Sequence, residues 1–143
     1  MITNARSLST LASAFLLATS AAIVPGCAKP ESPAPCTGPA TTVTVVIESD
    51  GKTSNKEAYV CEGRDTVEWF PADPDTYVSE DLQWKEGSPF EHAPKHETHG
   101  TRKVLKSEKP KRGTAGKGYP YDAWLVLKDG TKKQVDPIIR IMP

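Results

Sequence analysis

The sequence predicts an all-β fold, an antiparallel Greek-key β-sandwich of about seven strands. Three observations lead to this prediction. Short runs of β-branched and aromatic residues alternate with turn residues from residue 42 onwards. No segment has a convincing helical period of useful length. The predicted strands follow one another without intervening helices, which favours a sandwich over a doubly wound sheet.

The chain divides into three parts that differ in composition. We predict a lipoprotein signal peptide at residues 1–26, a lipidated cysteine with a proline-rich tether at residues 27–40, and the sandwich domain at residues 41–143. The 143 residues allow one domain of ordinary size. With 37% apolar and 25% charged residues, the chain is neither a polytopic membrane protein nor a highly charged disordered one.

Strand patterns bounded by turn residues recur along the predicted domain. In the first of them, Val43, Val45 and Ile47 are β-branched and mostly alternate with other residues. The strongest pattern comes last, where Asp129 and Gly130 predict a hairpin turn between two apolar runs. The predicted strands are residues 42–48, 57–62, 66–70, a short strand within 77–84, a brief one at 104–105, 119–127 and 135–142.

Two segments between these strands are predicted to be loops. Residues 85–101 contain three His, two Pro and two Gly but little apolar content. Residues 106–118 are rich in Lys and Gly around Pro110, which predicts a mobile basic loop.

The first segment of the chain has the pattern of an export signal. Residues 8–24 carry no charge and are mostly apolar, and Arg6 precedes them. An apolar run of about 17 residues is at the short end of what crosses a bilayer as a permanent helix. The pattern therefore predicts a mature protein outside the cytoplasm.

The signal ends at Val24, Pro25, Gly26 and Cys27, which resembles the bacterial lipobox. The resemblance implies that Cys27 is linked to diacylglycerol, that the peptide is cut before it, and that the new amino terminus is acylated, as with palmitate. Pro25 departs from the pattern, which usually has Ala or Ser there. An ordinary secretory signal cut elsewhere is the alternative. Ala28 replaces the Asp that commonly retains lipoproteins in the inner membrane, and it favours the outer membrane in a Gram-negative cell.

The three cysteines of the sequence form an odd set. If Cys27 carries lipid, Cys36 and Cys61 remain as an even pair, and a disulfide persists outside the cytoplasm. Such a bond would attach the second half of the tether to the domain. We therefore predict a lipid anchor at Cys27, which holds the protein on the membrane, and a disulfide between Cys36 and Cys61.

Three short motifs suggest a family. Residues 65–69 follow Gly63 and Arg64 and resemble the GDTVxW signature of cupredoxins, with Arg64 inserted. Residues 118–121 resemble the GxYxY strand that leads to the copper loop, and residues 88–90 resemble an sPF element of cupredoxin-like bacterial proteins. The resemblance implies a cupredoxin-like sandwich, and other immunoglobulin-like sandwiches are the alternative.

The resemblance does not extend to the copper site. A blue-copper centre needs a thiolate, two imidazoles and usually a weak axial thioether. Residues 122–126 follow the GxYxY-like strand, and neither they nor the residues up to Met142 include Cys, His or Met. We therefore expect no resident cofactor and no copper-based electron transfer.

One cluster has the residue types of a metal site. His92, His96 and His99 lie within eight residues of one another, and imidazoles suit Zn²⁺ or Cu²⁺. Pro94 interrupts the helix that would place all three rings on one face. The alternative is a solvated polar loop.

The net charge of zero conceals two oppositely charged halves. Residues 41–91 carry twelve acids and four bases, whereas residues 92–143 carry twelve bases and five acids. In one interpretation, the opposite charges simply face each other across the sheets. The other is a basic finger that contacts anionic envelope lipid or an acidic protein. Its residues are Lys103, Lys106, Lys109, Lys111, Arg112 and Lys117.

The sequence contains no motif for a reaction. There is no Gly-x-Ser-x-Gly elbow and no glycine-rich phosphate loop leading into a helix. The balanced charge argues against nucleic acid as a partner. We therefore predict a membrane-anchored lipoprotein that is not an enzyme and has a binding or structural role at the cell envelope. The alternative is a metal-binding or metal-delivery module that uses the three His residues.

Overall fold

The computed structural model describes residues 35–143. The predicted signal peptide, the lipobox with Cys27 and most of the tether lie outside these residues. Within the described part of the chain, no helix is long and apolar enough to cross a membrane. The strands are β1 (Thr42–Ile47), β2 (Glu57–Cys61), β3 (Thr66–Pro71), β4 (Tyr77–Val78), β5 (Gln83–Trp84), β6 (Lys95–His99), β7 (Arg102–Lys106), β8 (Gly118–Val126), β9 (Lys132–Val135) and β10 (Ile138–Met142).

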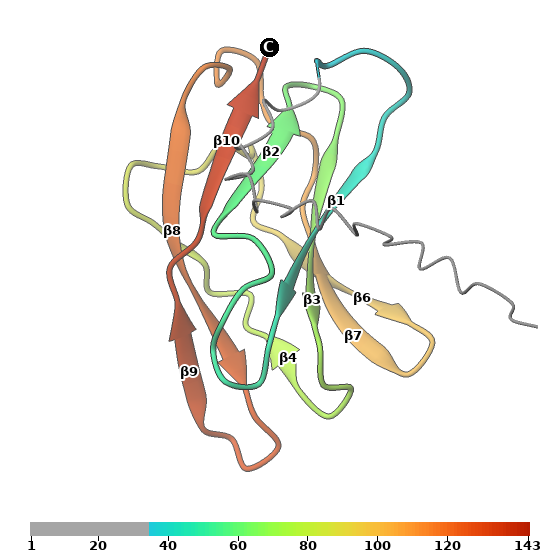
Figure 1. Ribbon diagram of the computed structural model, residues 1–143, viewed down its shortest axis with the longest axis vertical. Helices are drawn as coiled ribbons and strands as arrows, with labels where there is room; N and C mark the ends of the chain where they lie inside the picture. The colour runs from blue at the N-terminus through green and yellow to red at the C-terminus, as the bar shows by residue number, and fades with distance from the viewer. Residues whose placement is uncertain (1–34) are drawn as a thin grey trace, which may run out of the picture. The chain divides into compact units, whose positions relative to one another are not determined.

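The strands form two sheets, which confirms the predicted all-β sandwich (Figure 1). One sheet has the order β1-β3-β7-β6, and the other has the order β2-β10-β8-β4, with β5 and β9 also paired to β8. The sheets are mixed rather than wholly antiparallel, because β1 pairs with β3, and β2 with β10, in parallel. The chain leaves the first sheet after β1, enters the second as β2 and returns as β3, so β1 and β3 run in the same direction.

The predicted strands before residue 71 and the long strand β8 agree closely with the structure. The segment 77–84 forms two short strands, β4 and β5, which both pair with β8. The last predicted strand is divided between β9 and β10, and Asp136 and Pro137 lie between them. Both parts pair with β8 at different positions along its length.

The prediction that residues 85–101 form only a loop is wrong at β6. This strand pairs with β7 over five residue pairs at the edge of its sheet. Four of its five side chains are exposed, and only His96 is half-buried. An edge strand is held by backbone hydrogen bonds, so it needs no apolar alternation, and the sequence pattern therefore did not reveal it.

An aromatic cluster at the centre of the core joins the three motifs that resemble cupredoxins. Trp69 packs edge-to-face against Phe90 and Tyr121, with ring centroids 6.4 and 6.0 Å apart. Trp84 covers the same Tyr121 ring at 4.6 Å. The buried indole of Trp69 also donates a hydrogen bond of 2.6 Å to the Tyr121 hydroxyl. These motif residues therefore have a structural use in the core.

Replacing Tyr121 with Phe is expected to lower the free energy of unfolding by about 1–2 kcal/mol, because the Trp69 N–H loses its acceptor inside the core. Denaturant unfolding followed by tryptophan fluorescence measures this change. Tyr59→Phe is the control, since the Tyr59 side chain is exposed and bonds only to Glu57 at the surface. Equal effects of the two substitutions would contradict the buried hydrogen bond.

Candidate functional site

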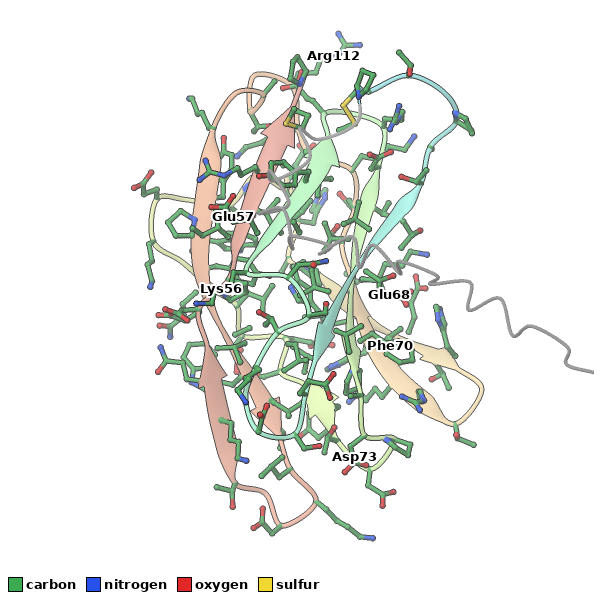
Figure 2. All side chains as sticks on the ribbon, in the orientation of Figure 1. Lys56, Glu57, Glu68, Phe70, Asp73 and Arg112 are labelled. Carbon is green, nitrogen blue, oxygen red and sulfur yellow. A yellow bond between two sulfur atoms is a disulfide. The ribbon has the colours of Figure 1, made fainter. Side chains whose placement is uncertain are left out.

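Several candidate site residues lie at one end of the sandwich, which we call the disulfide end. It consists of the disulfide between Cys36 and Cys61, the turn of residues 62–65 and the loop of residues 107–117. Figure 2 shows Arg112 at this end, near the disulfide, and Asp73 at the opposite end. A hydrogen bond from the Gly63 N–H to the Pro110 carbonyl joins the turn to the loop.

The predicted disulfide between Cys36 and Cys61 is present, with 5.7 Å between the two Cα atoms. It attaches residue 36 to the last residue of β2. The position at which the tether reaches the domain is therefore fixed at the disulfide end. The guanidinium of Arg64 lies beside the bond and donates to the Cys61 sulfur at 3.1 Å.

Asp65 is the buried charge that organises this end. Its side chain is 3% exposed and pairs with the Arg64 guanidinium at 2.7 Å. It also accepts hydrogen bonds from the backbone N–H groups of Thr41 and Cys61, both at 3.0 Å. Burial alone raises the pKa of Asp65, but the bonds from Arg64, Cys61 and Thr41 outweigh it and hold the pKa at about 2. The carboxylate therefore links the start of β1, the end of β2 and the turn.

The sequence did not predict that Asp65 would be a buried partner of Arg64 and Thr41. The available sequence signal was the position of Asp65 after Gly63 and Arg64, in a turn that connects two apolar strands. A turn aspartate usually faces solvent, and only the fold shows that Thr41 lies across from it.

Glu62 holds the basic loop in place from the end of β2. Its carboxylate accepts hydrogen bonds from the N–H groups of Thr114 at 2.7 Å and Ala115 at 3.0 Å. The pKa of Glu62 lies below its ordinary value, chiefly because of the Ala115 N–H. Two more backbone bonds, from Lys111 to the Pro89 carbonyl and from Gly116 to the Ile141 carbonyl, fix the same loop. A segment predicted to be mobile thus has a backbone that is attached at several points.

Replacing Glu62 with Gln is expected to raise the hydrogen-exchange rates of the Thr114 and Ala115 amides by roughly tenfold, because a neutral amide oxygen is a weaker acceptor than a carboxylate. Mass-spectrometric exchange on peptides from residues 107–117 measures the change. Glu48→Gln is the control, because Glu48 is exposed and lies far from this loop in the sequence. Unchanged protection in Glu62→Gln would show that the carboxylate does not hold the loop.

The six residues of the predicted basic finger are divided between a strand and a loop. Lys103 and Lys106 belong to β7, where Lys103 lies over the ring of Tyr77 and Lys106 is 3.5 Å from Glu97. The other four are in the loop of the disulfide end, and their side chains are exposed. None of these four forms an ion pair within residues 35–143. They are Lys109, Lys111, Arg112 and Lys117.

The three histidines of the predicted metal site have separate partners. His92 is 2.9 Å from Glu108. The half-buried His96 lies between Glu80 at 2.6 Å and the Val78 carbonyl at 2.7 Å, and so links β6 to β4. Within the described residues, no group of three or more His, Cys, Asp or Glu side chains could hold a metal ion. The remaining ring, that of His99, is within 3.6 Å of Glu68 and Glu97.

A groove of about 560 Å³ runs between β1 and β2 beside the disulfide. These two strands are edge strands of different sheets, so the groove is the open side of the sandwich. Val43, Ala58 and the exposed ring of Tyr59 line its apolar part, and Arg64 and Asp65 lie at the disulfide end. The charges of Arg64 and Asp65 pair with each other, but the buried Arg64 Nη1 has no hydrogen-bond partner within residues 35–143. The groove therefore offers shape, apolar area and one buried donor.

These observations define a class of protein: an all-β sandwich domain to which a disulfide attaches the tether. The adjacent loop presents basic side chains that form no ion pair within residues 35–143. No protein-family model matches the sequence, and no curated protein matches it.

Proposed function

We propose that this chain is a bacterial lipoprotein, anchored through Cys27 to the outer side of a membrane, with a non-enzymatic binding or structural role at the cell envelope. In a Gram-negative cell, Ala28 favours the outer membrane. The sandwich is proposed to be cupredoxin-like without the copper ligands, and the meeting of the three motifs in the aromatic core supports this.

The observation that carries the proposal is the disulfide between Cys36 and Cys61. It uses two of the three cysteines, so Cys27, which follows the apolar segment, is left for lipidation. A structural disulfide is also typical of proteins outside the cytoplasm. Both inferences agree with the lipobox-like residues at positions 24–27.

The charged groups near the disulfide support a structural use over a catalytic one. Asp65 is fully engaged by its four hydrogen bonds, and Glu62 is used by backbone amides. At the far end, Asp75 pairs with Lys128, and Asp73 accepts from a backbone N–H in its own turn. These carboxylates stabilise local structure.

The test is incorporation of an alkyne fatty acid by the full-length protein in a bacterial host. We expect labelled wild-type protein and no label in Cys27→Ser. The control is Cys36→Ser/Cys61→Ser, which loses the disulfide but keeps the acylation site and should remain labelled. Label that persists in Cys27→Ser, or no label in the wild type, would disprove the lipid anchor.

A further inference from the structure

We propose that the disulfide end is a contact surface for the phosphate headgroups of anionic lipids, made by Lys109, Lys111, Arg112 and Lys117. This inference deepens the proposed function and rests on the anchor at Cys27. It specifies which face of the domain is turned toward the membrane and what chemistry that face recognises.

The four basic side chains of the disulfide end lie on a loop whose backbone is held in place. Glu62 fixes the loop backbone, and Pro110 is buried against the turn at Gly63. The basic side chains around them are exposed on a support that is already folded. Figure 2 shows Arg112 at the extreme of this end. A fixed loop loses little conformational entropy when it binds a surface.

The acidic side chains of this end are already engaged by partners within the domain. The turn and the loop together contain three acidic side chains, and each has an internal partner. Glu62 binds loop amides, Asp65 pairs with Arg64, and Glu108 lies 2.9 Å from His92. The four cations have no such partner among the described residues, so their charge is left for an external anion. The opposite end differs, because Lys52 and Lys128 pair with Asp50 and Asp75.

The segment that joins the disulfide end to the predicted anchor is short. The disulfide fixes Cys36 at this end, and Cys27 is only nine residues away. Nine extended residues span at most about 30 Å. The attraction of lysine and arginine to an anionic leaflet falls off within a Debye length of about 8 Å at physiological salt. A short tether at the basic end keeps these cations within reach of that layer, and a tether at the opposite end would not.

The groove between β1 and β2 and the three histidines do not carry an equivalent proposal. The groove has no unpaired charge to select an occupant, and the histidines are held by neighbouring carboxylates. An acidic protein partner is the other chemistry that would fit the basic loop. The short distance to the anchor favours lipid, and the experiment below separates the two.

The experiment is a lysine footprint of the purified lipidated protein in vesicles. A membrane-impermeant acylating reagent labels exposed amines, and mass spectrometry measures the rate at each lysine. Vesicles of phosphatidylcholine with phosphatidylglycerol are compared with vesicles of phosphatidylcholine alone. Lys56, Lys95 and Lys132 are internal references, because they are exposed and lie outside the disulfide end.

We expect the rates at Lys109, Lys111 and Lys117 to fall by at least roughly threefold relative to the references in anionic vesicles at low salt. The protection should disappear at high salt and be absent in phosphatidylcholine. Equal changes at loop and reference lysines, or protection that does not depend on anionic lipid, would overturn the proposal. The first of these results is also the one expected if the partner is an acidic protein.

A matched pair of variants tests whether the charges act together. In Lys109→Gln/Lys111→Gln/Arg112→Gln, Lys117 remains as a reporter and should lose its protection. In Lys56→Gln/Lys95→Gln/Lys132→Gln, which removes the same number of charges elsewhere, Lys117 should stay protected. Failure of the anchor is recognised separately from the mass of the amino-terminal peptide. If the purified protein carries no lipid, the proposed function is disproved. The same footprint of this non-lipidated protein with excess vesicles would still decide whether the loop contacts anionic headgroups.

Discussion

Replacing Asp65 with Asn is expected to lower the free energy of unfolding by about 3 kcal/mol, because it breaks a buried ion pair by removing one partner. The carboxylate uses one oxygen for Thr41 and Arg64 and the other for Cys61 and Arg64. An asparagine keeps only one of these acceptors and directs its NH₂ group at the other donors. Denaturant unfolding followed by tryptophan fluorescence measures the decrease in the free energy of unfolding.

Asp50→Asn is the matched control for this substitution. Asp50 also pairs with a basic residue, Lys52, but both side chains are more than half exposed, and such pairs contribute little. If the two variants lost the same stability, the special role of the buried Asp65 would be contradicted.

The same residue predicts an acid limit to stability. The pKa of Asp65 is about 2 in the folded protein and near its ordinary value of 3.8 when unfolded. Because the folded pKa is the lower one, the stabilisation is complete above about pH 4 and is lost as the pH falls toward 2. It amounts to about 2 kcal/mol. In unfolding curves between pH 5 and pH 2, the Asp65→Asn variant should show a correspondingly smaller loss than the wild type.

Reducing the disulfide is expected to lower the free energy of unfolding by about 3 kcal/mol, because it releases a loop closed over a sequence separation of 25 residues. Reduction also detaches residue 36 from the end of β2. The hydrogen bond from the Thr41 N–H to Asp65 then joins the start of the domain to the turn of residues 62–65. Thermal unfolding with and without a dithiol reductant measures the effect. The largest increase in hydrogen exchange should occur around residues 36–41.

The control for this prediction is Cys36→Ser/Cys61→Ser. It should have the stability of the reduced wild type and should not respond to the reductant. A variant that remained as stable as the oxidised protein would show that the bond contributes nothing to the fold.

Much of the sandwich could be predicted because its strands bury one face in the core. In β1, the buried Val45 and Ile47 alternate with exposed or half-buried positions, and this is the kind of pattern on which the prediction rested. The parallel pairing of β1 with β3 could not be predicted in this way. Alternation identifies strands and their faces, but it carries no information on which strand is the neighbour.

The site was less predictable than the fold, because its chemistry depends on contacts that are distant in sequence. Proximity in sequence grouped His92, His96 and His99, yet the fold gives each ring its own carboxylate partner. Lys103 and Lys106 were grouped with the basic loop in the same way, but they belong to β7, where Lys103 lies over the Tyr77 ring and Lys106 is 3.5 Å from Glu97. The disulfide could be anticipated because the assignment of Cys27 to the lipid leaves Cys36 and Cys61 as an even pair. Its position beside Lys111, Arg112 and the other loop cations, which form no ion pair in the part of the chain that the structure describes, became visible only in the fold.

The lipid anchor is tested most directly by the mass of the amino-terminal peptide of the protein purified from a bacterial host. We expect a peptide that begins at Cys27 and carries a thioether-linked diacylglycerol, with a further acyl chain on its amino group. A mature protein that begins at another residue, or that begins at Cys27 without lipid, would contradict it.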